Sequence, residues 1–232
     1  MQNSLLESTR NTRDLGGHTT QSGTKTAYLR FWRSDKPTAL TEKDLQTLLE
    51  NGITTMVDLR NNTEIKNYPH SLRNAEGFTY CHCPMYGNSE VPREGHLVPQ
   101  SYFSMVTGGP KSLCDIMRAL TSAEGGVMYN CAEGKDRTGV ITALLLLLAG
   151  VPANAIVEDY HLSKVNLQDL IEKWKTDPDF KYAIEVMIPE REYMAGFLEI
   201  FSENYPNVET FLLEIGLTEN EISNLKIKLL EK

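Results

Sequence analysis

The chain has 232 residues, of which 41% are hydrophobic, and a formal net charge of -8 at pH 7. This size allows one substantial core, so we expect a single domain over residues 1–232. The acidic balance argues against nucleic acid or an anionic membrane as a general partner, because both select a basic face. The most apolar run, residues 140–151, is shorter than the roughly 20 residues that a bilayer span needs, so no stable membrane insertion is expected.

Turn residues and apolar spacing divide the first half of the chain into strands and helices. Thr41-x-x-Asp44 resembles a capping box that opens a helix, and Asn51-Gly52 closes it. A second helix is expected over residues 110–122. Strands are expected over residues 25–33, 53–59, 77–83 and 126–130. This alternation predicts an α/β fold with a parallel sheet that helices cover on both faces.

The second half of the chain reads as helical throughout. Helices are predicted over residues 152–165, 189–204, 207–215 and 219–231. Asp177-Pro178-Asp179 interrupts the pattern between the first two of these helices. The segment 165–190 is therefore expected to be a helical insertion, either a lid that gates the substrate or a simple cover of the core.

The four cysteines, at positions 81, 83, 114 and 131, are too few for a disulfide framework in a chain of this length. Cys81-His82-Cys83 has no second ligand pair, and a strand would place both thiols on one apolar face, so a metal site is not expected there. Redox protection of Cys131 by one of these thiols is the alternative. Residues 1–13 are polar and do not resemble a secretion signal. The sequence therefore predicts a reduced, cytoplasmic protein.

The segment from Asn130 to Gly139 places one cysteine six positions before one arginine, between a strand and an apolar helix. The backbone N–H groups between Cys131 and Arg137 can curl around one oxyanion, and the helix N-terminus adds its positive end. Arg137 offers a planar fork to two phosphate oxygens, and the same field favours the thiolate form of Cys131. The sequence therefore predicts a phosphate-binding loop with a nucleophile in its floor. The residues that would line the bound phosphate are Ala132, Glu133, Gly134, Lys135 and Thr138.

Three neighbours fit this loop. The Thr138 hydroxyl can hydrogen-bond the sulfur when it departs, Gly134 permits unusual backbone angles, and Gly139 is expected to let the helix pack close to the sheet. A nucleotide-binding loop is a poor match, because Asp136 stands where Ser or Thr should hold magnesium and Tyr129 stands where a glycine is needed.

A thiolate that attacks a phosphate ester needs a proton donor for the departing oxygen. The sequence has no aspartate between Arg60 and Cys114, and the glutamates of that interval are Glu64, Glu76, Glu90 and Glu94. Asp136 is the predicted acid, with a role as helix N-cap as the alternative. Asp58 is a third candidate, although it is expected to pair with an arginine such as Arg60 or Arg13. Lys135 is expected to add a cation beside the phosphate, or else to be solvated.

With these motifs the chain resembles the bacterial and fungal tyrosine-phosphatase-like family, whose members carry Asn-x-Arg-Asp-x-Gly-Gly and Cys-x-x-Gly-Lys-Asp-Arg-Thr-Gly. The first motif is residues 11–17 here and the second is residues 131–139, while Arg33-Ser34-Asp35 and Val57-Asp58-Leu59-Arg60 also match. The resemblance implies a cysteine-phosphatase fold, a phosphocysteine intermediate, no metal or other cofactor, and a phosphorylated protein or phosphoinositide as substrate. It also carries the roles of acid and loop lysine to Asp136 and Lys135.

Two residues depart from the family pattern. Asn130 stands where phosphatases with this loop usually have histidine, and it can support the loop only through hydrogen bonds. Glu133 occupies a position that is usually small and uncharged, and we expect its charge to point outward, because at low dielectric it would repel a dianion. Two alternatives stay open: an inositol-phosphate or phosphoinositide phosphatase, if Lys135 contacts a second phosphate, and a phosphate-binding pseudophosphatase.

Overall fold

The computed structural model describes residues 4–86 and 91–230. Within these residues, five strands form one sheet in the order β1-β2-β5-β3-β4. Strand β1 pairs antiparallel with β2, and the other neighbours are parallel. The strands are β1 (Arg13–Asp14), β2 (Phe31–Ser34), β3 (Ile53–Asp58), β4 (Thr79–His82) and β5 (Gly126–Asn130). The predicted α/β fold with a mostly parallel sheet is confirmed, and the antiparallel edge strand is an addition.

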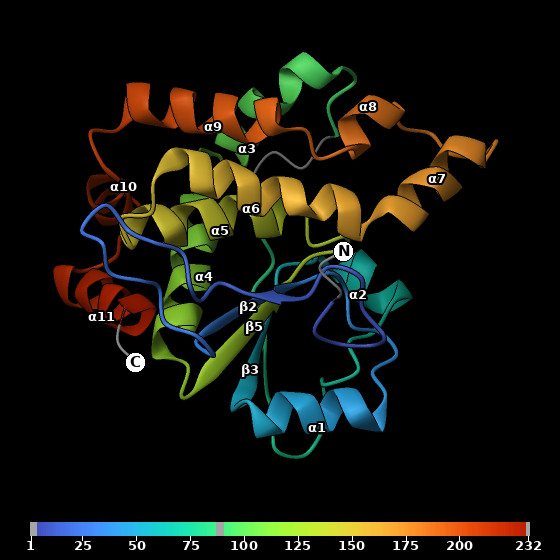
Figure 1. The fold of residues 1–232 in the computed structure, drawn as a ribbon, viewed down its shortest axis with the longest axis horizontal. Helices are drawn as coiled ribbons and strands as arrows, with labels where there is room; N and C mark the ends of the chain where they lie inside the picture. The colour runs from blue at the N-terminus through green and yellow to red at the C-terminus, as the bar shows by residue number, and fades with distance from the viewer. Residues whose placement is uncertain (1–3, 87–90, 231–232) are drawn as a thin grey trace.

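Helices cover both faces of the sheet in layers (Figure 1). Helix α1 (Glu42–Glu50) lies on one face, whereas α4 (Pro110–Ser122) and α5 (Asp136–Leu148) lie on the other. Beyond α5, the helices α3 (Val98–Thr107), α6 (Ala153–Asn166) and α9 (Arg191–Asn204) form an outer layer. The remaining helices are α2 (Asn62–Asn67), α7 (Gln168–Thr176), α8 (Ile184–Met187), α10 (Val208–Glu214), α11 (Glu219–Leu230) and the 3-10 turn η1 (Gly95–Leu97).

Side chains of the central strands alternate between two apolar cores. Val127 and Tyr129 of β5 pack into the large core beneath α4 and α5, whereas Met128 joins Met56 and Trp32 in the small core beneath α1. This alternation follows from the two-residue period of a strand, and burial on both faces explains why the central strands are largely apolar. Strand β5 is thereby fixed at the centre of the molecule, and so is the loop that follows it.

Most of the expected helices are present with small shifts at their ends. Both halves of the predicted capping box are formed, because Thr41 Oγ1 accepts from the Asp44 N–H and Asp44 Oδ2 accepts from the Thr41 N–H. Helix α4 and strand β5 have the predicted bounds. Helix α11 ends at Leu230, and Glu231, which the prediction included, lies outside the described residues.

The predicted strand over residues 25–33 is wrong in its extent. Only Phe31–Ser34 forms the strand β2. Leu29 interrupts the segment with a φ of 62°, in the left-handed region, and its N–H donates to Asp14 Oδ2 at 2.8 Å. The strand is therefore confined to the part of the segment after this turn, and it contains Phe31 and Trp32.

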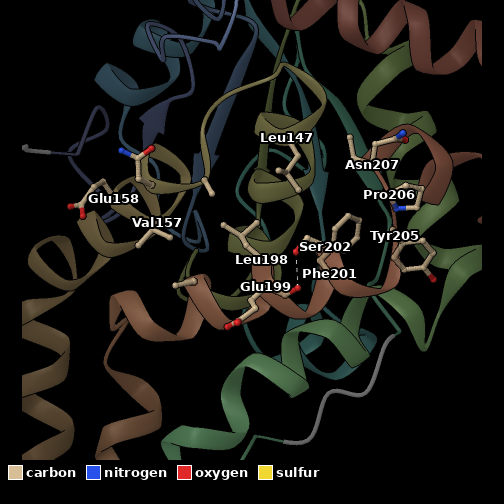
Figure 2. Close-up of a pocket in the computed structure, with 14 residues that line it drawn as sticks. Leu147, Val157, Glu158, Leu198, Glu199, Phe201, Ser202, Tyr205, Pro206 and Asn207 are labelled. Carbon is tan, nitrogen blue, oxygen red and sulfur yellow. Dashed lines mark hydrogen bonds between the residues drawn. The ribbon is translucent and has the colours of Figure 1, made fainter.

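Among the hollows of the described residues, two are candidates for the functional site. The larger, of about 700 Å³, is an apolar groove between α6, α9 and α10, lined by residues such as Leu147, Leu198 and Tyr205 (Figure 2). The smaller, of about 440 Å³, contains residues of the loop after β5. The smaller hollow is the candidate site, because the larger shares no lining residue with that loop among the described residues. None of the described helices combines the length and the apolar character needed to cross a membrane.

Candidate active site

Cys131 lies directly after β5, at the edge where the parallel strands end. Asn130, the last residue of β5, is in register with Ser34 of β2 and Asp58 of β3. The cysteine is 2% exposed and forms the start of a loop that leads into α5 at Asp136. Ligands of such sheets bind at this edge, beyond the carboxyl ends of the strands.

Donors from outside the loop hold three of its consecutive carbonyl groups. The Lys36 N–H donates to Ala132 O at 3.0 Å, and Asn11 Nδ2 donates to both Glu133 O and Gly134 O at 3.1 Å. Arg33 Nη2 donates to Gly134 O at 2.7 Å. No N–H of residues 132–135 donates to any other part of the described chain. With the carbonyl groups held on the outside, this arrangement favours N–H groups that face the hollow, which is the geometry of an anion-binding nest.

Gly134 is required by this curl of the loop. Its φ is 65°, and an added Cβ would lie 2.6 Å from backbone atoms of Ser34 and Asp35. The prediction for Gly139 was wrong in its contact. A Cβ there would lie 3.1 Å from the Tyr160 ring, so this glycine makes room for α6 rather than for the sheet.

Arg137 is oriented by a carboxylate that the sequence did not connect with it. Its Nη1 and Nη2 donate to the two oxygens of Glu64 at 2.7 Å and 2.6 Å. Glu64 is itself fixed, because it forms a capping box with Asn61 at the start of α2. The Arg137 Nε–H and the outer N–H of Nη2 are not used by this pair, so the guanidinium keeps donors for an oxyanion.

The electrostatics of this pair favour full charge on both partners. Burial opposes charge on Arg137, but the hydrogen bond from Glu64 and the charges of Cys131 and Glu64 outweigh burial and raise the pKa of Arg137. Burial also opposes charge on Glu64, and Arg137 nevertheless lowers the pKa of that carboxyl. Arg137 is therefore a fixed cation at the rim of the loop.

Asp136 is the first residue of α5 and lines the hollow. The N-cap position belongs to Lys135, which makes no side-chain capping bond, so the N-cap alternative for Asp136 is wrong. The Tyr102 hydroxyl donates to Asp136 Oδ1 at 2.5 Å and also contacts the Tyr160 hydroxyl at 2.7 Å. These contacts engage one carboxylate oxygen and leave Oδ2 without a partner among the described residues.

Lys135 is buried, which contradicts the alternative of a solvated lysine. Its Nζ donates to Val186 O in α8 at 2.8 Å and lies 3.3 Å from Asp136 Oδ1. The lysine thus links the loop to the predicted insertion, where α7 and α8 lie (Figure 1). Trp174, Phe180 and Tyr182 of the same insertion line the hollow; Trp174 stacks on Phe180, and Tyr182 meets Phe180 edge to face.

Glu133 also lines the hollow, and its carboxylate lies 3.8 Å from Lys36 Nζ. Burial raises the pKa of Glu133, and although Lys36 opposes this shift, Asp136 adds to it. The side chain is therefore at the rim and not fully turned away from the site. Thr138 is buried at the start of α5, and its hydroxyl has no hydrogen-bond partner among the described residues.

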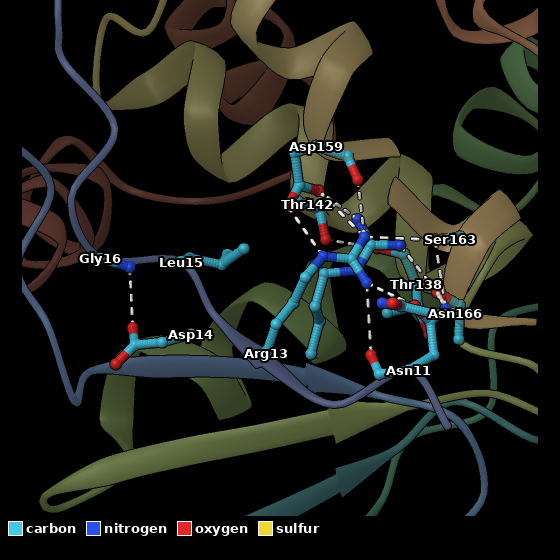
Figure 3. A network of polar contacts seen from close by, with 12 residues as sticks. Asn11, Arg13, Asp14, Leu15, Gly16, Thr138, Thr142, Asp159, Ser163 and Asn166 are labelled. Carbon is cyan, nitrogen blue, oxygen red and sulfur yellow. Dashed lines mark hydrogen bonds and ion pairs between the residues drawn. The ribbon is translucent and has the colours of Figure 1, made fainter. Parts of the chain in front are cut away.

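A buried ion network holds the loop from behind (Figure 3). Arg13 Nε and Arg33 Nη1 donate to the Asp159 carboxylate at 3.0 Å and 2.5 Å, and Arg13 Nη1 donates to Asn11 Oδ1 at 2.6 Å. Burial opposes charge on Asp159, but the two arginines hold its pKa well below the usual range. Burial and the neighbouring Arg33 lower the pKa of Arg13 to about 10. Asn11 of the first motif therefore contacts the second motif directly, whereas Arg13 supports it by holding the Asn11 side chain.

Asp58 pairs with Arg60, as expected, at 2.7 Å. Arg13, the other arginine considered for this pair, pairs with Asp159 instead. Burial opposes charge on Asp58, but the hydrogen bonds from Arg60 lower its pKa. Asn130 Nδ2 donates to Asp58 Oδ1 at 3.4 Å and to Cys131 O at 3.2 Å.

The other residues that the sequence brought forward lie outside these contacts. Glu76 and Glu94 do not line the hollow, and Glu90 lies outside the described residues. Cys81 and Cys83 pack against the large core, as predicted, and His82 contacts Arg60 O. In the described part of the chain, no group of three or more His, Cys, Asp or Glu side chains could hold a metal ion.

Sequence reasoning missed Glu64, Tyr102 and Asp159 as contacts of the site. The Asn61-x-x-Glu64 spacing is a capping-box signature and could have located α2, but not the pairing with Arg137. Tyr102 and Asp159 lie in helices, 34 and 23 residues from Asp136 along the chain, so only the fold brings them to the loop.

The fold and the loop together define the class of the protein, which is an α/β phosphatase. A sequence model of the tyrosine phosphatase family matches residues 5–231, so the chain belongs to this family. It is 29% identical over 216 residues to the tyrosine-protein phosphatase of Nostoc commune, an alignment that covers 82% of this chain and 70% of that one. It is 23% identical over 124 residues to the triple specificity protein phosphatase PtpB of Mycobacterium tuberculosis, covering 46% and 45%. Among solved structures, TpbA of P. aeruginosa aligns over 88% of this chain and 98% of that chain, at 13% identity and a TM-score of 0.41.

Proposed function

We propose that this phosphatase hydrolyses phosphotyrosine through a phosphocysteine intermediate on Cys131. The proposal is carried by the loop itself: a buried cysteine, carbonyl groups held on the outside, and Arg137 fixed at the rim. Together these groups favour one tetrahedral oxyanion directly above the sulfur.

In the first step, the Cys131 thiolate attacks phosphorus and the bond from phosphorus to the ester oxygen breaks. The loop N–H groups and Arg137 hold the phosphoryl oxygens, on which charge is spread in the transition state. Asp136, protonated on Oδ2, gives its proton to the departing oxygen. The products of this step are the free phenol or alcohol and a thiophosphate on Cys131.

In the second step, water attacks the thiophosphate and the sulfur leaves as a thiolate. Asp136 is now a carboxylate and takes a proton from this water, while the unpaired Thr138 hydroxyl hydrogen-bonds the departing sulfur. Inorganic phosphate is released, and the enzyme returns to its starting state.

The aromatic residues of the insertion support an aryl phosphate as substrate. Trp174 and Phe180 stack with ring centroids 5.4 Å apart, beside the hollow of about 440 Å³ above the loop. A phenyl ring gains contact area and favourable ring geometry against such a wall. The name of the relative from Nostoc commune agrees with this choice, and that of PtpB makes phosphoserine and phosphothreonine necessary comparisons.

A second phosphate on the ligand is less well supported, because Val186 O and Asp136 already engage Lys135 Nζ. The proposal also retains a reducing, cytoplasmic location, which the four free cysteines support.

The deciding experiment measures release of phosphate from a phosphotyrosine peptide, phosphoserine and phosphothreonine peptides and a phosphoinositide, all in the presence of a chelator. We expect the phosphotyrosine peptide to be the best substrate and Cys131→Ser to be inactive. Acid quench followed by mass spectrometry should place one phosphoryl group on the peptide that contains Cys131. Full activity of Cys131→Ser would contradict the mechanism, and a wild type that binds phosphate without turnover would favour the pseudophosphatase.

A further inference from the structure

Two buried polar atoms without partners lie beside the nucleophile loop. Asn130 Oδ1 and His70 Nε2 are each buried, and each has no hydrogen-bond partner among the described residues. Their residues are both enclosed, with Asn130 0% and His70 3% exposed. An unpaired buried polar atom is costly, so two complementary ones in the same cluster call for an explanation.

The protonation of His70 can be derived from its other nitrogen. The Leu72 N–H donates to His70 Nδ1 at 3.1 Å, so Nδ1 is an acceptor. In a neutral imidazole the proton must then be on Nε2. Nε2 is therefore a donor that forms no hydrogen bond among the described residues. Burial lowers the pKa of His70 to about 4, so the ring is neutral at pH 7.

The orientation of Asn130 can be derived in the same way. Its Nδ2 donates to the Asp58 carboxylate and to Cys131 O. The reverse orientation would turn the amide oxygen toward a carboxylate, which is unfavourable. Asn130 Oδ1 is therefore an acceptor that needs a donor.

His70 and Asn130 belong to one cluster. The His70 ring packs on Tyr80 with centroids 5.1 Å apart, Tyr80 Oη donates to Asp58 Oδ2 at 3.0 Å, and Asp58 contacts Asn130. The Asn130 side chain also acts on the pKa of His70 as a hydrogen-bonding neighbour that opposes the effect of burial. The two side chains form no hydrogen bond with each other in this structure, although each carries the kind of atom that the other lacks, a donor on His70 and an acceptor on Asn130.

We propose that His70 is a positioning residue for the nucleophile loop: its Nε2–H donates to Asn130 Oδ1 and fixes the amide so that Nδ2 holds the Cys131 carbonyl. His70 and Asn130, which come from different parts of the chain, would then together support the loop through hydrogen bonds. In other phosphatases with this loop, one histidine directly before the cysteine usually takes that position. This inference rests on the proposed role of Cys131 as nucleophile.

Two substitutions of His70 distinguish the role of Nε2 from the role of the rest of the ring. His70→Gln keeps a donor near the position of Nε2, whereas His70→Asn keeps an amide near Nδ1 and removes the donor toward Asn130. Asn130→Ala removes the acceptor and the contact with Cys131 O. His161→Asn, at a histidine that contacts Pro189 O instead, is the control for general loss of an imidazole.

The measurement is the rate at which iodoacetamide alkylates Cys131 across pH, with kcat/KM for an aryl phosphate beside it. We expect His70→Asn and Asn130→Ala each to lower kcat/KM about tenfold and to shift the alkylation midpoint to higher pH, because each loses one buried hydrogen bond. The double variant should be no worse than either single variant, and His70→Gln should retain most of the wild-type behaviour.

A wild-type alkylation profile in His70→Asn, or additive effects in the double variant, would overturn the proposal. Urea unfolding of each variant establishes that alkylation is measured on folded protein. Alkylation does not require turnover, so a wild type that hydrolyses no substrate would contradict the proposed function and still leave this test decisive.

Discussion

At the scale of single residues, the proposed mechanism depends on which oxygen of Asp136 is free. Tyr102 and Lys135 engage Oδ1, whereas Oδ2 has no partner among the described residues, and Asp136 lines the hollow. A carboxyl held by one oxygen can carry a proton on the other without losing its orientation. This arrangement allows a single aspartate inside the loop to serve first as acid and then as base.

Asp136→Asn should therefore affect substrates according to their leaving group. For an alkyl phosphate, whose alkoxide departs poorly, we expect kcat to fall by about a hundredfold or more, the usual contribution of a general acid. For an aryl phosphate with an acidic phenol, the fall should be several times smaller. Steady-state assays on both substrates, with Asp115→Asn on the exposed side of α4 as control, measure the difference. Equal losses on both substrates would refute the role of acid.

Gly134 illustrates how a residue without a side chain controls the site. Gly134→Ala combines a positive φ with a Cβ placed 2.6 Å from the backbone of Ser34, whereas Gly23→Ala has a positive φ and no atom within 4 Å. We expect Gly23→Ala to cost about 1 kcal/mol of unfolding free energy and Gly134→Ala about 3 kcal/mol, because only the latter adds a clash. Urea unfolding compares the two variants. Similar losses would show that the contact with Ser34 relaxes freely.

At the scale of elements, the insertion of α7 and α8 is tied to the loop by one buried lysine. Lys135 donates to Val186 O in α8, and this bond links the wall of the hollow to its floor. The segment can therefore respond to what the loop binds. Its gating role remains a prediction.

Lys135→Met keeps the length and apolar stem of the side chain but removes this bond. We expect faster amide hydrogen exchange in α8 and a KM for aryl phosphates raised about tenfold, since one charge-assisted hydrogen bond is lost. Lys173→Met, at an exposed position of α7, is the matched control. Unchanged exchange in α8 would show that the insertion is held by its apolar contacts instead.

The elements also show where sequence information ends. The capping box at Thr41, the strand before Cys131 and the long buried helix after it were predictable, because each depends on local spacing. The curl of the loop depends instead on Asn11, Arg33 and Asp159, which are distant in sequence. Pairings such as Arg137 with Glu64 need side chains whose meeting is set by tertiary packing, and no local pattern encodes them.

At the scale of the whole molecule, buried charge makes stability depend on pH. Asp58 and Asp159 have lowered pKa values, so their ion pairs stabilise the fold above the usual carboxyl range and are lost in acid. Burial raises the pKa values of Asp35 and Glu133, which contribute a slope of opposite sign. The dependence of the unfolding free energy on pH is therefore a sum of opposing contributions. The contribution of one group is measured by comparing the wild type with a variant that lacks this group.

His70 offers such a comparison. Its pKa is lowered from about 6.5 to about 4, because burial in the fold favours the neutral ring. The unfolded chain therefore binds the proton more readily, and the stabilisation is present above pH 6.5 and is lost as the pH falls toward 4. Between pH 7 and pH 4.5 we expect wild type to lose about 2 kcal/mol more unfolding free energy than His70→Gln, which does not titrate in this range.

Urea unfolding at several pH values between these limits measures the difference directly. His96→Gln, which removes an exposed histidine, is the control for the loss of an imidazole that is not buried. If the unfolding free energies of wild type and His70→Gln changed in parallel with pH, His70 would bind its proton equally well in the folded and unfolded states. In that case the fold would not hold Nδ1 as the acceptor of the Leu72 N–H, which is the contact that places the proton of the neutral ring on Nε2. This measurement on the whole molecule therefore also bears on the nucleophile loop.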